Sequence, residues 1–156
     1  MNNTKMMIVK PDKKEYIFVY GTLREGGKNY NIIYNETKLK KIGLGITKDT
    51  YSFIGTMSGA FPYATQTLFD GIEKVNIIGE LYEILETNYL QNLDKLEYNY
   101  SREMVSVIVS GKTYQTNMYV LVNNELIDGI TSNVYPNGRK RFYAIKSGDW
   151  FEEKPS

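Results

Sequence analysis

Short apolar runs separated by turn-forming residues dominate the chain and predict mostly β-strands. Residues 16–20, Tyr-Ile-Phe-Val-Tyr, are continuously apolar and rich in β-branched and aromatic side chains, which is typical of a buried strand. Residues 75–85 form the clearest long strand, and shorter runs at 41–46, 51–54 and 63–67 also favour strands.

The second half of the chain predicts a β-hairpin. Residues 102–109 alternate between two faces, Gly111 begins a turn, and residues 113–122 return as the second strand. Residues 29–34 indicate a short helix, whereas residues 128–143 are rich in loop-forming types. Many strands with few helices predict an α+β domain built on a curled sheet or a small barrel.

Residues 86–97 predict a short amphipathic helix that ends on a carboxylate. At about 100° per residue, four apolar side chains share one arc of this helix: Tyr89, Leu90, Leu93 and Leu96. Glu97 follows Leu90 by seven positions and Leu93 by four, so it lies within the same arc. The pattern therefore directs Glu97 toward the core.

A carboxylate that faces a core is costly unless it has a partner, and loss of water raises its pKa. A raised pKa suits a general base that must later return its proton, so Glu97 is a candidate catalytic residue. The simpler interpretation is that Glu97 merely ends the helix with its head group in water, and the helix pattern alone leaves both open.

Length and charge limit the possible classes. The 156 residues suit one domain, which we predict at 15–153 behind a flexible leader at 1–14. The net charge is +1, with 19 basic and 18 acidic residues, so no broad field attracts nucleic acid or anionic lipid. The chain shows no apolar run of transmembrane length and no signal-peptide core, so we expect a cytoplasmic protein.

The chain contains neither cysteine nor histidine. Disulfides, thiolate nucleophiles, imidazole acid–base chemistry and most zinc or iron sites are therefore excluded. Any catalysis has to rest on carboxylates, tyrosines, lysines, hydroxyls or backbone amides.

The glycine-rich loop after the first strand resembles a phosphate-binding loop only superficially. The Walker pattern has four residues between its first glycine and the Gly-Lys pair, but five residues separate Gly21 from Gly27, and Asn29 replaces the magnesium-binding hydroxyl. The same loop suits another anion better, because backbone amides that turn outward after a buried strand can bind a carboxylate.

This loop resembles the opening signature of the gamma-glutamylcyclotransferase-like superfamily, and in particular its gamma-glutamylamine cyclotransferase branch. The similarity continues in order along the chain from residue 16 to Trp150. It is carried by these motifs: Tyr20-Gly21-Thr22-Leu23-Arg24 with Gly26 or Gly27 and Asn29, Phe61-Pro62-Tyr63, Ile78-Gly79-Glu80-Leu81-Tyr82, Leu93-Asp94-Lys95-Leu96-Glu97, Tyr100-Ser101-Arg102 and Tyr119-Val120.

The resemblance implies a small mixed β-barrel flanked by short helices, with a substrate cavity at one end. It implies that Tyr20 and the residues after it form one wall, where the amides of Gly21, Thr22 and Leu23 hold the substrate's α-carboxylate. The acid–base glutamate of the family corresponds to Glu97. The tyrosine that shapes the family's pocket corresponds to Tyr100.

The implied reaction closes a γ-glutamyl amine or amide onto itself, which yields 5-oxoproline and a free amine. The substrate carries its own nucleophile, so folding it back supplies most of the catalysis. Neither a metal nor a cofactor is expected, and the only implied partner is a small γ-glutamyl molecule. Tyr98 stands where the family usually has a small residue, which leaves the substrate open.

Other assignments remain open in the sequence. Arg24 is either a ligand for a substrate carboxylate or, as is commoner at a strand end, a solvated charge. Glu80 is interpreted as a structural partner of Arg102 or a lysine. The whole chain could instead be a non-catalytic binding or interaction protein for a small anion, although a carboxylate at Glu97 gives an anion binder no advantage. Acyl transfer to another acceptor, or lyase-type release of an amine, would use the same residues.

Overall fold

The computed structural model describes residues 14–56, 62–86, 88–97, 100–122, 124–132 and 142–152. The predicted leader therefore lies, apart from Lys14, outside the described residues. The strands and helices of the described part follow in chain order: β2 (Glu15–Val19), α1 (Tyr30–Ile33), β3 (Leu39–Thr56), β4 (Pro62–Thr65), β5 (Val75–Ile84), α2 (Tyr89–Leu96), β6 (Tyr100–Val109), β7 (Lys112–Leu121), α3 (Asn124–Ser132) and β8 (Phe142–Ala144).

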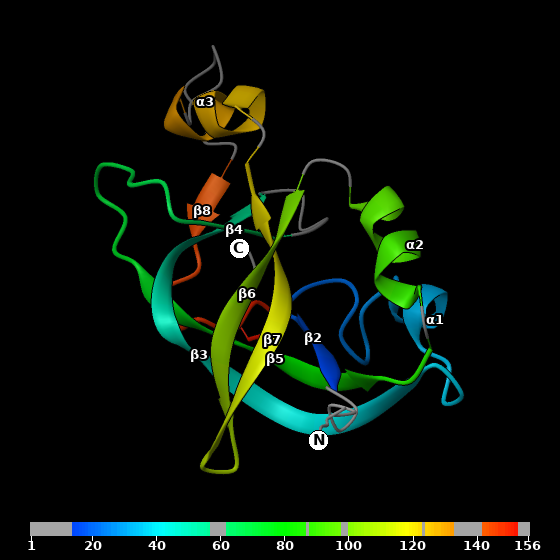
Figure 1. Ribbon diagram of the computed structural model, residues 1–156. Helices are drawn as coiled ribbons and strands as arrows, with labels where there is room; N and C mark the ends of the chain where they lie inside the picture. The colour runs from blue at the N-terminus through cyan, green and yellow to red at the C-terminus, as the bar shows by residue number, and fades with distance from the viewer. Residues whose placement is uncertain are drawn as a thin grey trace, which may run out of the picture.

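A closed five-stranded barrel forms the centre of the structure. Its strands are hydrogen-bonded in the order β3, β5, β2, β7 and β6, and the pairing of β3 with β6 closes the ring. The β2–β7 pair is parallel and the other pairs are antiparallel, so the barrel is mixed. Figure 1 shows β3 curling round the barrel, and the far half of β3 also pairs with the two remaining strands, β4 and β8.

The closing contact between β3 and β6 depends on a glycine. A Cβ atom at Gly45 would lie 2.7 Å from a methyl group of Val107 and 2.8 Å from one of Val109. Contacts that short are not tolerated, so only glycine lets β3 approach β6 this closely.

The single strand β3 corrects the prediction of separate strands at 41–46 and 51–54. Its polar middle resembles a turn in the sequence, yet the strand passes through it with register shifts at Lys41/Gly43 and Ile46/Thr50. Side chains secure the second irregularity, because the hydroxyl of Thr47 accepts a 2.8 Å hydrogen bond from the Ile77 amide.

The strand β2 is buried on both faces, which explains its continuous apolar run. Phe18 packs inside the barrel, in a cluster that also contains Phe53, Leu81, Val107, Met118 and Trp150. Ile17 and Val19 point the other way and pack against Leu90 and Leu93 of α2. The period-two alternation of a strand thus serves two separate clusters.

The hairpin prediction is confirmed, since β6 and β7 pair throughout and the turn between them has positive φ at Ser110 and Gly111. The loop prediction for 128–143 is wrong over residues 128–132, which belong to α3, and over β8. Residues 133–141 lie outside the described part. Ile130 of α3 packs with Phe142 of β8 and Leu121 of β7, so tertiary packing stabilises a helix that the local sequence does not announce.

Candidate functional site

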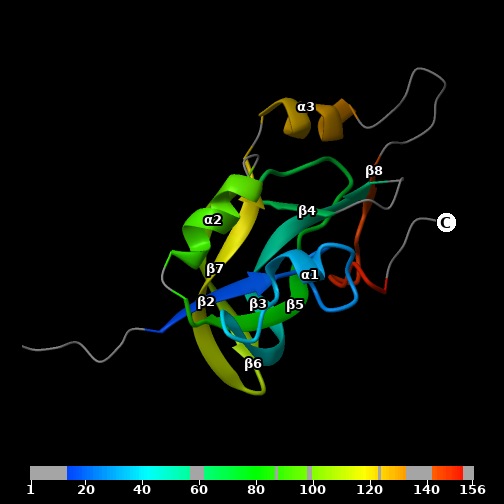
Figure 2. The same ribbon diagram turned by 90° about the vertical axis from the view of Figure 1, so that its right-hand side faces the viewer.

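Chain topology gathers the candidate residues at one end of the barrel. Because β2 and β7 are parallel, their carboxyl ends lie at the same end, and β6 begins there because Tyr100 pairs with Leu121. The helix α2 ends just before β6 starts, so Glu97, the residue that caps α2, is delivered to the same end. Figure 2 shows α2 beside β7 at the side of the barrel.

Glu97 ends the helix, but its side chain is half-buried rather than fully solvated. Its amide donates a forked hydrogen bond to the carbonyls of Leu93 and Asp94, both at 3.2 Å, and its carbonyl accepts one from the Tyr100 amide at 3.0 Å. Among the described residues, the Glu97 carboxylate has no hydrogen-bond or ion-pair partner. Burial raises the pKa of this carboxyl group above its ordinary value.

Glu97 lies close to tyrosines from three strands or strand ends. Burial raises the pKa values of Tyr20, Tyr100 and Tyr119, and the negative charge of Glu97 raises each of them further. These phenols therefore stay protonated, and their hydroxyls donate to the Tyr119 carbonyl, the Asp94 carboxylate and the Pro62 carbonyl rather than to Glu97.

The Tyr20 hydroxyl is held in place from both sides. It donates a 2.6 Å hydrogen bond to the Tyr119 carbonyl and accepts one from the Ala64 amide. The Pro62 ring packs on Gly21, where a Cβ atom would lie only 2.8 Å from it, and the Tyr100 hydroxyl is 3.5 Å from the Pro62 carbonyl. Pro62, the first residue of β4, thus lies between Gly21 and Tyr100.

The glycine loop is closed by its own hydrogen bonds. The Asn29 amide donates to the Thr22 carbonyl at 2.9 Å, and the Asn29 side chain donates to the Thr22 hydroxyl at 3.0 Å. Within the described part of the chain, the amides of Gly21, Thr22 and Leu23 donate no hydrogen bond outside the strands. These amides are therefore available to bind an anion.

An ion pair fixes the end of α2 to the barrel. Arg102 forms a fork with Asp94, with Nε–Oδ1 and Nη2–Oδ2 distances of 2.9 and 3.1 Å, and its Nη1 donates to Asn117 at 3.0 Å. The Tyr119 hydroxyl donates to the same carboxylate at 2.5 Å. The hydrogen bonds from Arg102 and Tyr119 lower the pKa of Asp94, against a smaller opposing effect of burial.

Comparison with known proteins decides the family. The sequence profile of the family described as "Gamma-glutamyl cyclotransferase, AIG2-like" matches residues 17–152, nearly the whole described chain. The protein belongs to this family. A candidate gamma-glutamylcyclotransferase of Methanocaldococcus jannaschii is 36% identical over 110 residues, which are 67% of this chain and 82% of that protein.

A second relative agrees with the family assignment, and a solved structure shows the same fold. The gamma-glutamylaminecyclotransferase A of Danio rerio is 33% identical over 92 residues, which are 58% of this chain and 55% of that protein. The crystal structure of an AIG2-like protein from mouse superposes with a TM-score of 0.59 at 24% identity, over 70% of this chain and 78% of that one. The predicted α+β barrel fold is therefore confirmed as that of the gamma-glutamyl cyclotransferase, AIG2-like family. None of the described helices is long and apolar enough to cross a lipid bilayer.

The structure brings together most of the residues that the sequence singled out. Glu97, Tyr20 and Tyr100 interact electrostatically, and the loop of Gly21 and Thr22 begins directly at Tyr20. The side chain of Leu23 packs against the hydrophobic cluster that contains Leu90 and Leu93 of α2.

Two neighbours of Glu97, Tyr119 and Asp94, are not identified as site residues by the sequence, where each occurs only within a motif. Their link to Arg102 becomes visible only in the hairpin register, where Arg102 pairs with Tyr119. The sequence predicts the hairpin but not which residues of its two strands pair.

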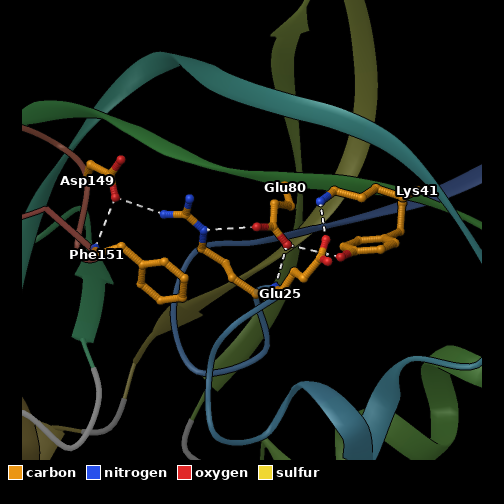
Figure 3. A network of polar contacts seen from close by, with 7 residues as sticks. Glu25, Lys41, Glu80, Asp149 and Phe151 are labelled. Carbon is orange, nitrogen blue, oxygen red and sulfur yellow. Dashed lines mark hydrogen bonds and ion pairs between the residues drawn. The ribbon is translucent and has the colours of Figure 1, made fainter.

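The predictions for Arg24 and Glu80 need correction. Arg24 is not a solvated charge, because only 5% of the residue is exposed, and Glu80 is only 4% exposed. The partner of Glu80 is Arg24 rather than Arg102 or a lysine, with Nε 3.4 Å from Oε2. Figure 3 shows this network, in which Asp149 provides a second carboxylate for the guanidinium. The low exposure follows from partners that supply compensating charge from distant parts of the chain.

Proposed function

We propose that this protein cyclises a γ-glutamyl amine or amide to 5-oxoproline with release of the free amine, and that Glu97 is its general acid and base. One observation carries the proposal: the Glu97 carboxylate is half-buried, has a raised pKa and has no partner within the described residues. Such a group is a structural cost that a catalytic role explains.

The loop after β2 supports the binding half of the proposal. The amides of Gly21, Thr22 and Leu23 would hold the α-carboxylate of the substrate, since they donate to no other group of the described chain outside the strands. The buried phenol of Tyr20 begins this loop, and the Tyr100 ring stands beside Glu97. A substrate held by the loop would therefore have its amino group within the neighbourhood of Glu97.

The proposed reaction needs one proton acceptor that becomes a donor. Glu97 takes a proton from the α-ammonium group. The lone pair of the resulting amine nitrogen then attacks the γ-carbonyl carbon and closes a five-membered ring. The tetrahedral oxyanion then collapses, the carbon–nitrogen bond to the leaving amine breaks, and Glu97 returns its proton to that nitrogen. As the lactam forms, the ring nitrogen gives its second proton to the released amine, so one ammonium enters and one leaves.

Positioning supplies most of the rate in this scheme. The nucleophile and the electrophile belong to one molecule, so holding the chain folded back converts the binding energy of the carboxylate into reactivity. The scheme routes no step through a metal or a cofactor. The group attached to the γ-carbonyl is left open, and a lysine side chain, a small amine or another amino acid all fit the chemistry.

The test is release of 5-oxoproline from a panel of γ-glutamyl amines and γ-glutamyl dipeptides, followed by mass spectrometry. Wild type is compared with Glu97→Gln, in which an amide cannot accept the ammonium proton, and with Glu103→Gln as a matched control. Glu103 is an exposed glutamate of the neighbouring strand β6. Release by wild type and Glu103→Gln, with loss in Glu97→Gln, is the expected result.

Two results would contradict the proposal. Turnover by folded Glu97→Gln at close to the wild-type rate would remove Glu97 from the chemistry. Failure of the folded wild-type protein to release 5-oxoproline from any panel member, together with saturable binding of γ-glutamyl compounds, would favour the non-catalytic binder instead.

A further inference from the structure

The guanidinium of Arg24 is enclosed by charged and aromatic groups from two distant parts of the chain. Its Nη1 donates to Asp149 at 2.9 Å, and its Nε donates to Glu80 at 3.4 Å. The Phe151 ring covers it, with the guanidinium carbon 4.2 Å from the ring centroid. Only 6% of the Arg24 side chain is exposed, so it faces its protein partners rather than solvent or a ligand.

Glu80 accepts hydrogen bonds from two successive residues of the loop. One carboxylate oxygen accepts from the Arg24 side chain, and the other accepts a 2.7 Å hydrogen bond from the Glu25 amide. The Tyr82 hydroxyl donates to that second oxygen at 3.0 Å. Figure 3 shows Glu80 at the centre of this network, on the strand that forms the barrel wall.

Asp149 is itself fixed by the chain that follows it. Its Oδ1 accepts a 3.0 Å hydrogen bond from the Phe151 amide as well as the one from Arg24. The segment after β8 therefore provides both a carboxylate and an aromatic cover for a residue of the glycine loop, 125 positions away in sequence.

The backbone of Arg24 also sets the conformation of the turn before it. Its amide donates to the Gly21 carbonyl at 3.0 Å, and its carbonyl accepts from the Gly27 amide at 2.7 Å. One residue thus closes the turn 21–24 with its main chain and anchors it to the barrel with its side chain. The amides of residues 21–23 belong to that turn.

We propose that Arg24 is a positioning residue for substrate binding, which holds the amides of Gly21, Thr22 and Leu23 in place by bridging Glu80 and Asp149. The proposal rests on the proposed function, because those amides bind the substrate's α-carboxylate. Arg24 acts from behind the loop and does not touch the substrate. Loosening its bridge weakens recognition of the α-carboxylate and leaves proton transfer by Glu97 intact.

The experiment uses Arg24→Lys and Asp149→Asn in the full chain. A lysine keeps the charge but is a single point donor that cannot reach both carboxylates with the geometry of a planar fork. Asp149→Asn keeps the contact between Arg24 and Glu80 and weakens the second anchor by removing its charge. The matched control is Lys41→Gln. It removes the 2.6 Å ion pair between Lys41 of β3 and Glu25, the exposed loop residue that follows Arg24.

Each protein is assayed with the best γ-glutamyl substrate of the panel and with the same compound carrying an α-carboxamide in place of the α-carboxylate. We expect KM for the carboxylate substrate to rise about tenfold or more in both variants, with kcat within about threefold of wild type. The preference for carboxylate over carboxamide falls in parallel, while Lys41→Gln keeps wild-type values.

A merely structural role gives a different signature. Partial unfolding lowers kcat through the amount of active enzyme but leaves KM and the preference for the carboxylate unchanged, and that result overturns the proposal. If Arg24→Lys does not fold, Asp149→Asn decides by the same criteria. Wild-type inactivity on the whole panel overturns the proposed function and this proposal with it, whereas an active wild type with unchanged KM in the variants overturns only this proposal.

Discussion

Asp94 and Glu97 stand three residues apart at the end of α2, and their surroundings push their pKa values in opposite directions. Asp94 is paired with Arg102 and accepts a hydrogen bond from Tyr119, and its pKa is lowered. Glu97 is half-buried without a partner in the described chain, and its pKa is raised. One carboxylate holds the helix to the barrel, and the other is the group that the proposed function uses as general acid and base.

The comparison shows how the end of one short helix holds two carboxylates in different surroundings. The pair with Arg102 is made on the outer side of the helix end, where the two side chains remain 29% and 39% exposed. Glu97 lies on the arc of Leu90 and Leu93, which the barrel covers. The helix end therefore presents Asp94 to a partly exposed ion pair and Glu97 to a half-buried position.

The largest effect separates the two positions by activity. The same change, carboxylate to amide, should lower kcat by about 10³-fold in Glu97→Gln, because the proton acceptor is lost. Asp94→Asn should lower kcat by about tenfold or less, since it only loosens the position of Glu97. Steady-state 5-oxoproline release measures both. Equal losses in the two variants would contradict the division of roles.

The stabilities should change in the reverse order. Asp94→Asn weakens a forked ion pair and a phenol hydrogen bond, which at this exposure contribute about 1 kcal/mol, and it should lower Tm by about 2–4 °C. Glu97→Gln should unfold at or above the wild-type temperature near neutral pH, because it removes a half-buried charge that has no partner among the described residues. Thermal unfolding followed by circular dichroism gives both values, and a less stable Glu97→Gln would show that the carboxylate has a partner.

The pH dependence of stability should also differ in sign. The raised pKa of Glu97 means that its contribution to folding is fully present below its unfolded value and is lost as pH rises through the folded value. The advantage of Glu97→Gln should therefore be largest near pH 8 and vanish below about pH 4. The lowered pKa of Asp94 has the opposite consequence, so the cost of Asp94→Asn should be complete at neutral pH and fade as pH falls through the folded value. Urea unfolding across this range tests both signs.

The smallest effect is expected at the partner of Asp94. Arg102→Lys keeps the charge and loses the fork, so it should cost less than about 1 kcal/mol and leave kcat within about threefold of wild type. Urea unfolding at pH 7 measures the cost. A loss as large as that of Asp94→Asn would mean that the geometry of the fork, rather than the charge, stabilises the helix end.

Local patterns predicted the parts of the fold that local chemistry determines. The apolar run of β2, the hairpin and the helix before Glu97 all follow from periodicity, and the position of Glu97 on the apolar arc indicated its partial burial. The strand β3 was divided in error because its polar middle is compensated by β5, through Ile77 and Thr47. Such compensation depends on pairing between distant segments and has no local signature.

The burial of Arg24 could not be predicted for the same reason. Its partners follow it by 56 and 125 residues, and nothing in the sequence near Arg24 distinguishes a buried arginine from a solvated one. The family resemblance supplied the roles of Glu97 and the glycine loop, but it gave no partner for Arg24 and no role for Asp94. Those assignments needed the register of the barrel.

The most direct test of the account is a carbon-13 NMR titration of the side-chain carboxyl groups, with Glu97 and Asp94 assigned by the two amide variants. The account predicts that Glu97 titrates above the ordinary value of 4.5 for glutamate and that Asp94 titrates below the ordinary value of 3.8 for aspartate. A Glu97 carboxyl group that titrates at or below 4.5 would contradict it, since that group would be solvated or paired and would not be poised to accept and return a proton.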